Sequence, residues 1–315
     1  MRQEHLRLPV GSNLETSYNK KVFIITEVSG AEKLFCSQVI ILCMFSGKRD
    51  ALFIGRGYMY SAVIQLYRDK VFISKEMESY TEETFPAVFE KISKTLRRRV
   101  RIVLADEFVY ITRLTFPHGT EITRERVAQK AKEEIPEDLS STKWDFQTLT
   151  FTKQGGVSDE VLVQVAVLER RFYEMLKSIL ANQRLEIESV IPESYACAQF
   201  SVLGADPVIL VQKNPGNILL IALCNGFVML SDTIEGEIVT PSLIQQFIAS
   251  VERTKDILVK KVIFSYFSEE DVLPQEELVA SGYSVERGYY NPMVGTALQK
   301  KVRGRDEEVL NVKLT

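Results

Sequence analysis

The chain has 315 residues, of which 45% are hydrophobic and 26% are charged, a balance typical of a folded protein with one large domain or two ordinary ones. Its 39 Lys and Arg residues and 42 Asp and Glu residues give a net charge of −3, which argues against the broad positive field of a nucleic-acid-binding protein. The two histidines, His5 and His118, offer almost no material for a multi-histidine metal site or for histidine-based acid–base catalysis.

Residues 1–20 predict a polar leader without the apolar region of a secretory signal. No window is long and apolar enough to predict a membrane span. The four cysteines have no CxxC spacing and lie among apolar neighbours: Cys36, Cys43, Cys197 and Cys224. This pattern favours buried, reduced thiols, and a disulfide or a reactive thiol is the alternative.

The segment 21–75 is rich in β-branched and aromatic residues and predicts successive strands separated by turn residues. The expected strands cover residues 21–28, 34–44, 52–55, 58–67 and 70–75. A helix is expected over 81–99 because its apolar residues repeat at helical spacing. Thr81 is its expected N-cap, and Arg97–Arg99 are expected in its last turn, where positive charge is favourable.

Strands and helices alternate through the rest of the chain, with the clearest boundary at residues 204–207. Before this boundary, strands are expected at 101–105, 108–116, 144–152, 160–168 and 185–190, and helices at 123–135, 169–181 and 192–203. After it, strands are expected at 208–212, 218–223, 227–233, 262–267 and 283–287, and helices at 241–255, 269–281 and 293–302. Each half opens with antiparallel strands and then alternates helix and strand, which suggests two similar α/β lobes.

The sequence contains no P-loop, dinucleotide fingerprint, nucleophile elbow or zinc-protease motif. The segment Gly55-Arg56-Gly57 predicts a hairpin turn rather than a phosphate loop, because no helix follows it. Acidic residues occur mainly in charge runs typical of solvated surfaces. His118 is expected in a loop, and Trp144 is expected to pack in the core. We therefore predict no catalytic, cofactor-binding or metal-ligating residue.

Phe116-Pro117 closes an expected strand before a helix that stops at Pro136, and a Trp144-Asp145-Phe146 strand follows. A strand at 160–168 with a helix at 170–180, then a turn at 185–196 and a short helix at 294–298, complete the series. These segments, in this order, resemble the PilM family of actin-like proteins of type IV pilus assembly, and more distantly the cytoplasmic part of the GspL family of type II secretion.

The resemblance implies an α/β protein with the actin-like (ribonuclease H-like) two-lobed fold and an inserted α/β subdomain in the first lobe. The implied first lobe covers residues 21–203, with the inserted subdomain at about 81–168. The second lobe would cover 207–303, and a C-terminal tail would cover 304–315.

Members of this family normally carry two phosphate loops, each with a D-x-G sequence in a strand–turn–strand unit. The Asp holds magnesium, and the Gly lets backbone N–H groups approach phosphate. Counting along this chain places Thr26 and Val28 at the Asp and Gly positions of the first loop. Val211 and Lys213 fall at those positions in the second loop, to within one residue. Neither loop offers a carboxylate, and larger side chains at the Gly positions block close approach.

We therefore expect a pseudo-ATPase that is not an enzyme and holds no cofactor, with a nucleotide-binding actin-like ATPase or kinase as the alternative. The resemblance implies a cytoplasmic scaffold of a type IV pilus or related secretion platform, peripheral at the inner membrane through its partners. The implied partner is the cytoplasmic tail of a PilN-like single-span membrane protein, bound in a groove of the first lobe. Residues 308–314 faintly resemble such a tail, although an edge strand or frayed end is the simpler interpretation. Homo-oligomers are left open, no nucleic acid is expected as a partner, and an unrelated α/β protein is a third alternative.

Overall fold

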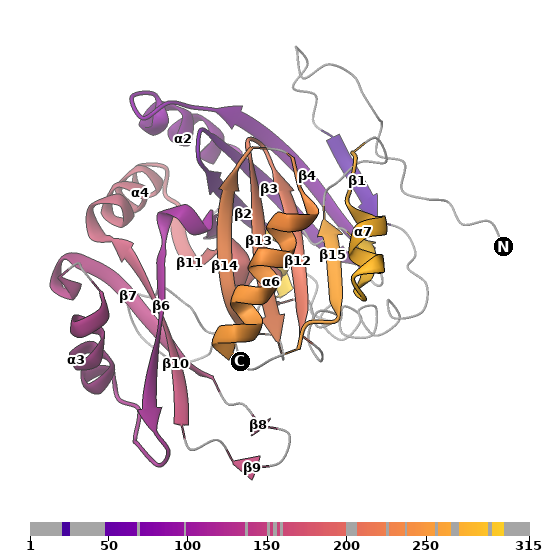
Figure 1. Ribbon diagram of the computed structural model, residues 1–315. Coiled ribbons are helices and arrows are strands. Elements are labelled where there is room, and N and C mark those ends of the chain that lie inside the picture. The colour runs from indigo at the N-terminus through magenta and orange to yellow at the C-terminus, as the bar shows by residue number, and fades with distance from the viewer. Residues whose placement is uncertain are drawn as a thin grey trace.

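The computed structural model describes residues 21–25, 48–67, 70–97, 99–135, 138–149, 152–153, 156–157, 160–199, 207–224, 227–236, 238–255, 258–265, 271–288 and 292–298. Over these ranges the chain forms sheets of six, five and three strands and a short two-stranded ribbon (Figure 1). The mixed α/β class expected from the sequence is confirmed.

The six-stranded sheet forms the first lobe. Its strand order is β1 (Lys21–Ile25), β4 (Lys70–Ser79), β3 (Tyr58–Tyr67), β2 (Lys48–Gly55), β5 (Arg99–Leu104) and β11 (Glu186–Pro192). The first four strands pair antiparallel, whereas β5 and β11 run parallel to β2. Helices α2 (Phe85–Ser93) and α4 (Arg170–Asn182) place Phe89, Leu176 and Leu180 in the core of this lobe.

The five-stranded sheet forms the second lobe and repeats this topology. Its strand order is β14 (Phe227–Glu235), β13 (Asn217–Cys224), β12 (Val208–Asn214), β15 (Lys261–Ser265) and β16 (Ser284–Gly288). As in the first lobe, two antiparallel strands follow the central strand, and two parallel strands complete its other side. Helix α6 (Pro241–Lys255) packs on one face of this sheet (Figure 1), and α7 (Gln275–Ala280) lies between β15 and β16 in the sequence. Strand β1 has no counterpart in this set, so it is an additional edge strand of the first lobe.

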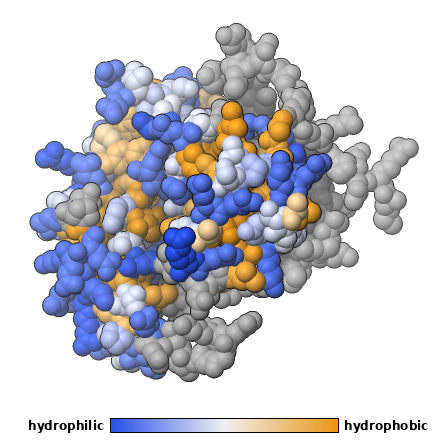
Figure 2. Space-filling view, viewed as in Figure 1, coloured by the Kyte–Doolittle hydropathy of each residue, from blue (hydrophilic) through white to orange (hydrophobic). Residues whose placement is uncertain are grey.

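The three-stranded sheet, which we call the insert, lies between β5 and β11 in the sequence. It consists of β6 (Tyr110–Pro117), β10 (Glu160–Glu169) and β7 (Thr142–Leu149), with helix α3 (Arg124–Glu134) packed on one face. Short elements complete this region: η1 (Asp106–Phe108), η2 (Leu139–Ser141), β8 (Thr152–Lys153) and β9 (Gly156–Val157). The expected start of the insert at residue 81 is too early, because α2 and β5 belong to the first lobe. Hydrophilic residues dominate the outer surface around α3 (Figure 2).

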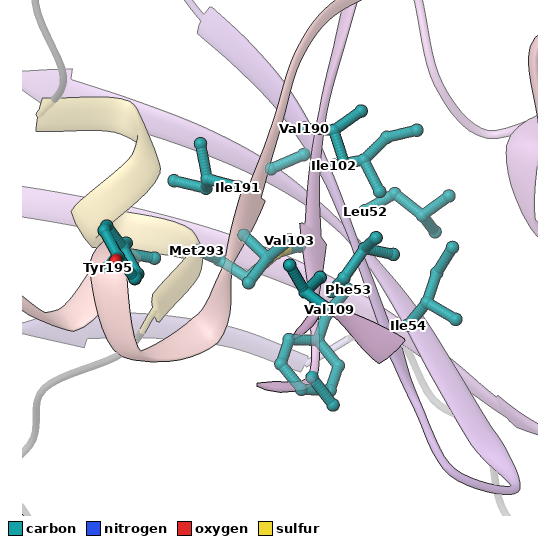
Figure 3. Packing of buried hydrophobic residues seen from close by; sticks show 14 of the residues in the cluster. Leu52, Phe53, Ile54, Ile102, Val103, Val109, Val190, Ile191, Tyr195 and Met293 are labelled. Carbon is teal, nitrogen blue, oxygen red and sulfur yellow. The ribbon is translucent and has the colours of Figure 1, made fainter. Parts of the chain in front are cut away.

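Two short helices join the lobes. Helix α5 (Glu193–Cys197) follows β11, and α8 (Pro292–Leu298) follows the second lobe but packs on α5 and on the first-lobe strands β2, β3 and β5. Tyr195 of α5 and Met293 of α8 lie in the same buried cluster as those strands (Figure 3). This cluster also includes Val208 and Leu210 of β12, so one hydrophobic core extends through both lobes. Helix α8 therefore belongs by its packing to the first lobe, not to the second as its sequence position predicts.

The helix expected over 81–99 is shorter than predicted, and its ends differ. Its N-cap is Thr84 rather than Thr81, and the helix ends at Ser93. The arginines expected in its last turn have other roles. Arg97 forms an ion pair with the buried Asp50 (Nη2–Oδ1, 2.9 Å), and Arg99 begins β5. Asp50 was expected in the turn before residue 52 but lies inside β2. Its carboxylate can be buried there because the positive charge of Arg97 neutralises it.

The structure also bears on the predictions about buried cysteines and membrane-spanning helices. Cys197 and Cys224 are buried, as expected. Cys36, Cys43 and the strand expected at 34–44 lie outside the described residues. Within the described part of the chain, no helix is long and apolar enough to cross a membrane.

Candidate functional site

The repeated topology identifies two equivalent hairpins, each formed by the central strand of a lobe and the strand that follows it. These are β2–β3, with its turn at Arg56-Gly57, and β12–β13, with its turn at Pro215-Gly216. The sequence comparison placed the first loop at Thr26 and Val28, which lie outside the described residues. That placement is corrected, because the strand before these residues is the edge strand β1 and not the central strand. Gly55-Arg56-Gly57 is a hairpin turn, as predicted.

Aromatic side chains fill the first hairpin. Phe53 is 1% exposed, and its ring stacks on those of Tyr58 and Tyr60, with centroid distances of 5.6 and 4.8 Å. The Tyr58 ring also covers Gly55, since a Cβ atom at Gly55 would lie 2.5 Å from Cζ of Tyr58. Tyr80 donates a hydrogen bond from its hydroxyl to the Gly55 carbonyl (2.5 Å). The Tyr58 ring therefore occupies the space beside Gly55 that the absence of a side chain leaves open.

In the second hairpin, alternate side chains of β12 point to opposite faces of the sheet. Val211 lies in the core beneath α6, and Lys213 pairs with Asp271 (Nζ–Oδ1, 2.6 Å). The two residues predicted at the loop positions therefore face away from the first lobe. Their neighbours Gln212 and Asn214, one residue further along, face it.

A buried polar cluster connects this hairpin to α5. Glu193 is 1% exposed and is the first residue of α5. Its carboxyl oxygens accept hydrogen bonds from Asn214 Nδ2 (3.0 and 3.3 Å) and from Gln212 Nε2. Gln212 Oε1 accepts from Cys197 Sγ (3.3 Å), one turn along the same helix. The second-lobe hairpin is thereby bonded to the helix that leaves the first lobe.

A second buried carboxyl lies beside this cluster. Asp106 Oδ1 accepts a hydrogen bond from the backbone N–H of Ser194 (3.0 Å), while Oδ2 is buried and has no hydrogen-bond partner among the described residues. Burial raises the pKa of Asp106, although hydrogen bonds from Ser194 oppose the shift. Burial, and then the nearby charge of Asp106, raise the pKa of Glu193 well above its usual range. Glu193 therefore keeps a proton at pH values where a solvated glutamate has lost it.

Acidic residues outside its own hairpin affect the pKa of Tyr58. Its pKa is raised first by burial and then by the charges of Glu193 and Glu107. The hydroxyl therefore stays neutral throughout the physiological range. Around this point the protein supplies an aromatic ring, two carboxyl groups and two amides, all of them buried or mostly buried.

Such an arrangement can hold the lobes together, because its polar groups bond mainly to one another. Pro215, in the second turn, has no N–H group to offer an anion. In the parts of the chain that the structure describes, no group of three or more His, Cys, Asp or Glu residues is placed to hold a metal ion.

Sequence reasoning missed the residues that form this cluster. Tyr58 and Glu193 looked like an ordinary strand residue and an ordinary helix-start residue. The period-two alternation of β12 was the available signal for Gln212 and Asn214, since residues flanking Val211 must face the opposite side. Of the other candidates, His118 is exposed in the turn after β6, as predicted. Trp144 is only partly buried, with the guanidinium of Arg124 4.1 Å from its ring centroid.

Two lobes of one topology, joined by two short helices and carrying an insert in the first lobe, define an actin-like fold. The comparisons with solved structures agree. The structure is similar to that of a PilM–PilN type IV pilus biogenesis complex, with a TM-score of 0.60 and 14% identity over 79% of this chain and 90% of that one. It is also similar to the cytoplasmic domain of EpsL, an inner membrane component of the type II secretion system of Vibrio cholerae (TM-score 0.51, 11% identity, 80% and 94% of the two chains). A third similar structure is a Bacteroides thetaiotaomicron protein of actin-like ATPase fold and unknown function (0.54, 11%, 81% and 96%).

These similarities confirm the expected actin-like fold and the expected likeness to PilM and to the type II secretion component. No protein-family model matches the sequence, and no curated protein matches it.

Proposed function

We propose that this protein is a non-catalytic scaffold of a type IV pilus or related secretion assembly platform. In this proposal it binds the cytoplasmic tail of a PilN-like single-span protein and works in the cytoplasm, at the inner membrane, through such partners. The likeness to the PilM–PilN complex and to the EpsL cytoplasmic domain supports this assignment. A similar fold also occurs in a protein described as having an actin-like ATPase fold and unknown function, so the two hairpins between the lobes must separate a scaffold from an ATPase.

The observation that carries the proposal is the Tyr58 ring packed against Gly55. A nucleotide phosphate held by the first hairpin would need the space next to this glycine, and the ring occupies it. Phe53, two residues earlier, provides a buried hydrocarbon where a magnesium site needs an oxygen ligand. In the second hairpin, the corresponding residues are amides bonded to Glu193. These features favour a pseudo-ATPase.

Calorimetric titration with ATP and Mg²⁺ tests the absence of nucleotide binding. We expect no heat of binding for the wild-type chain. The variant Tyr58→Ala removes the ring that covers Gly55, so it tests whether the ring alone prevents ATP binding. We expect this variant not to bind ATP either, because Phe53 and Gln212 still supply no carboxylate for Mg²⁺. Micromolar binding by the wild type would overturn the pseudo-ATPase proposal and favour the ATPase or kinase alternative.

Partner binding is tested separately, with peptides. Synthetic cytoplasmic tails of single-span proteins encoded near this chain's gene would be titrated against the full chain, with scrambled peptides of the same composition as controls. We expect saturable binding of one tail and none of its scrambled form, unchanged by added ATP. Failure of every tail to bind would remove the scaffold proposal without affecting the conclusion on nucleotide binding.

A further inference from the structure

Strand β14 is an edge strand of the second lobe, and of the strands that the structure describes it pairs only with β13. The pairing is irregular: Leu223 lies opposite Val228 and Ala222 opposite Leu230, so Met229 is an extra residue in the ladder. A bulge of this kind redirects backbone groups, and an edge strand leaves N–H and C=O groups to be satisfied elsewhere. The bulge therefore marks a point where another part of the protein can bind the strand.

The insert binds β14 at this point. The Val228 carbonyl accepts hydrogen bonds from Arg113 Nη2 (2.6 Å) and from Gln164 Nε2 (3.0 Å). Arg113 and Gln164 lie directly opposite each other on β6 and β10. Gln147 of β7 extends the row and donates from Nε2 to Gln164 Oε1 (3.2 Å). We call Arg113, Gln164 and Gln147 the polar row.

The polar row is placed on the side of the insert sheet that faces away from α3. Residues that alternate with it, such as Leu114 and Val163, pack in the insert core beneath that helix. On the same side as the row, Ala166 and Leu168 belong to the first-lobe core. The insert thus packs on the first lobe by apolar contacts and bonds to the second lobe by polar ones.

Burial makes these polar contacts specific. Gln164 is 1% exposed and Gln147 is 6% exposed. Burial lowers the pKa of Arg113 to about 10, so its guanidinium is still charged at neutral pH. Buried amides and cations are costly unless they find hydrogen-bond partners. Because the Val228 carbonyl supplies a partner to two of them, moving β14 away would leave both without it.

Strand β14 has two further contacts along its length. Ser231, near its middle, lies close to Asp106 of η1. Glu235, its last residue, forms an exposed ion pair with Arg56 in the β2–β3 turn (Oε1–Nη1, 2.6 Å). Strand β14 is therefore held by the polar row of the insert and by an exposed ion pair to the first lobe, in addition to the hydrogen bonds that join β12 to Glu193.

We propose that β14 and the polar row form a latch that fixes the angle between the two lobes without a ligand between them. The latch belongs to the fold itself and does not depend on which partner the protein binds. Breaking the latch should widen the range of angles between the lobes, while the hydrophobic core that they share keeps them together.

Spin labels on the full chain measure this directly. Ala87→Cys on α2 and Ala249→Cys on α6 place labels at exposed positions, one on each lobe. Cys36→Ser and Cys43→Ser remove the two cysteines that lie outside the described residues, so that only the introduced cysteines are labelled. The test variant combines Arg113→Leu with Gln164→Leu. The matched control, Arg126→Leu, removes an exposed arginine whose hydrogen bond is to Glu121 within the insert.

We expect the label-to-label distance distribution of the test variant to broaden and move to longer distances, with no change in the control. Amide hydrogen exchange over 228–231 should become about tenfold faster, the effect of losing one such hydrogen bond. An unchanged distribution in a folded test variant would overturn the latch. If the double variant does not fold, Gln164→Met and the surface variant Arg56→Ala are measured together. The same broadening is then expected, and its absence again refutes the proposal.

Discussion

Because the Tyr58 ring packs against Gly55, the effect of Gly55→Ala on the free energy of unfolding should change sign when Tyr58 is removed. Gly55 does not have a positive φ, so its backbone can accept an alanine without strain. The obstacle is the ring, because the new Cβ would lie 2.5 Å from Cζ and 2.8 Å from Oη of Tyr58. The ring cannot move away freely, since Tyr58 is 5% exposed and stacks on Phe53.

We therefore expect Gly55→Ala to destabilise the wild-type protein by about 1–3 kcal/mol, the usual cost of overpacking. Tyr58→Ala alone should cost about 3–5 kcal/mol, because it removes a large buried side chain. In the Tyr58→Ala background, Gly55→Ala should instead stabilise by about 0.4–1 kcal/mol, since the clash is gone and the unfolded chain loses freedom. The free energies of unfolding come from urea denaturation of the four proteins, analysed as a double-mutant cycle.

Tyr58→Phe is the matched control, because it keeps the ring and removes only the hydroxyl. In that background Gly55→Ala should still destabilise. Additive effects of Gly55→Ala and Tyr58→Ala would show that the ring does not cover the glycine. The space beside Gly55 would then be open to a phosphate.

Three further predictions concern stability. The raised pKa of Glu193 means that the folded state holds a proton that the unfolded state has released, so the urea midpoint should fall as pH rises above about 4.5, and Glu193→Gln should flatten that slope; an equally steep slope in the variant would refute the assignment. Asp50→Ala should cost about 1–3 kcal/mol, because it removes the buried partner of Arg97, whereas Arg99→Ala, at an exposed ion pair, should cost about 0–1 kcal/mol by the same denaturation assay; equal costs would contradict this reasoning. Met293→Ala should cost about 2–5 kcal/mol and lower the stability of β2 and β5 in hydrogen exchange; protection lost only in the second lobe would be inconsistent with the packing of α8.

The element types could be read from the sequence because their patterns are local. The hairpins of the second lobe and helix α6 have the expected type and nearly the expected bounds, since turn residues and apolar spacing define them. The helix at 81–99 was predicted too long, because the sequence after Ser93 keeps helix-forming residues. The pairing of Arg97 with Asp50, 47 residues earlier, decides its conformation instead. Long-range pairing of this kind leaves no trace in local periodicity.

The candidate site was less accessible to sequence reasoning. Counting residues back from Lys33 placed the first loop at Thr26, after a strand that is the edge strand β1 and not the central strand. The second loop was located only to within one residue, and in a strand a single residue exchanges one face for the other. Glu193 and Tyr58 could not have been brought together from sequence, because the electrostatic interaction between them joins elements far apart along the chain.

The position of α8 has a consequence for how the protein is made. The buried side chains of this helix, which comes after the whole second lobe in the sequence, complete a surface formed by β2, β3 and β5. During synthesis, these strands emerge long before residues 292–298 and must wait with that apolar surface uncovered, in a state that attracts chaperones or aggregates. The lobe that is translated first is therefore the one that finishes folding last, and any attempt to produce it alone would have to supply the missing helix.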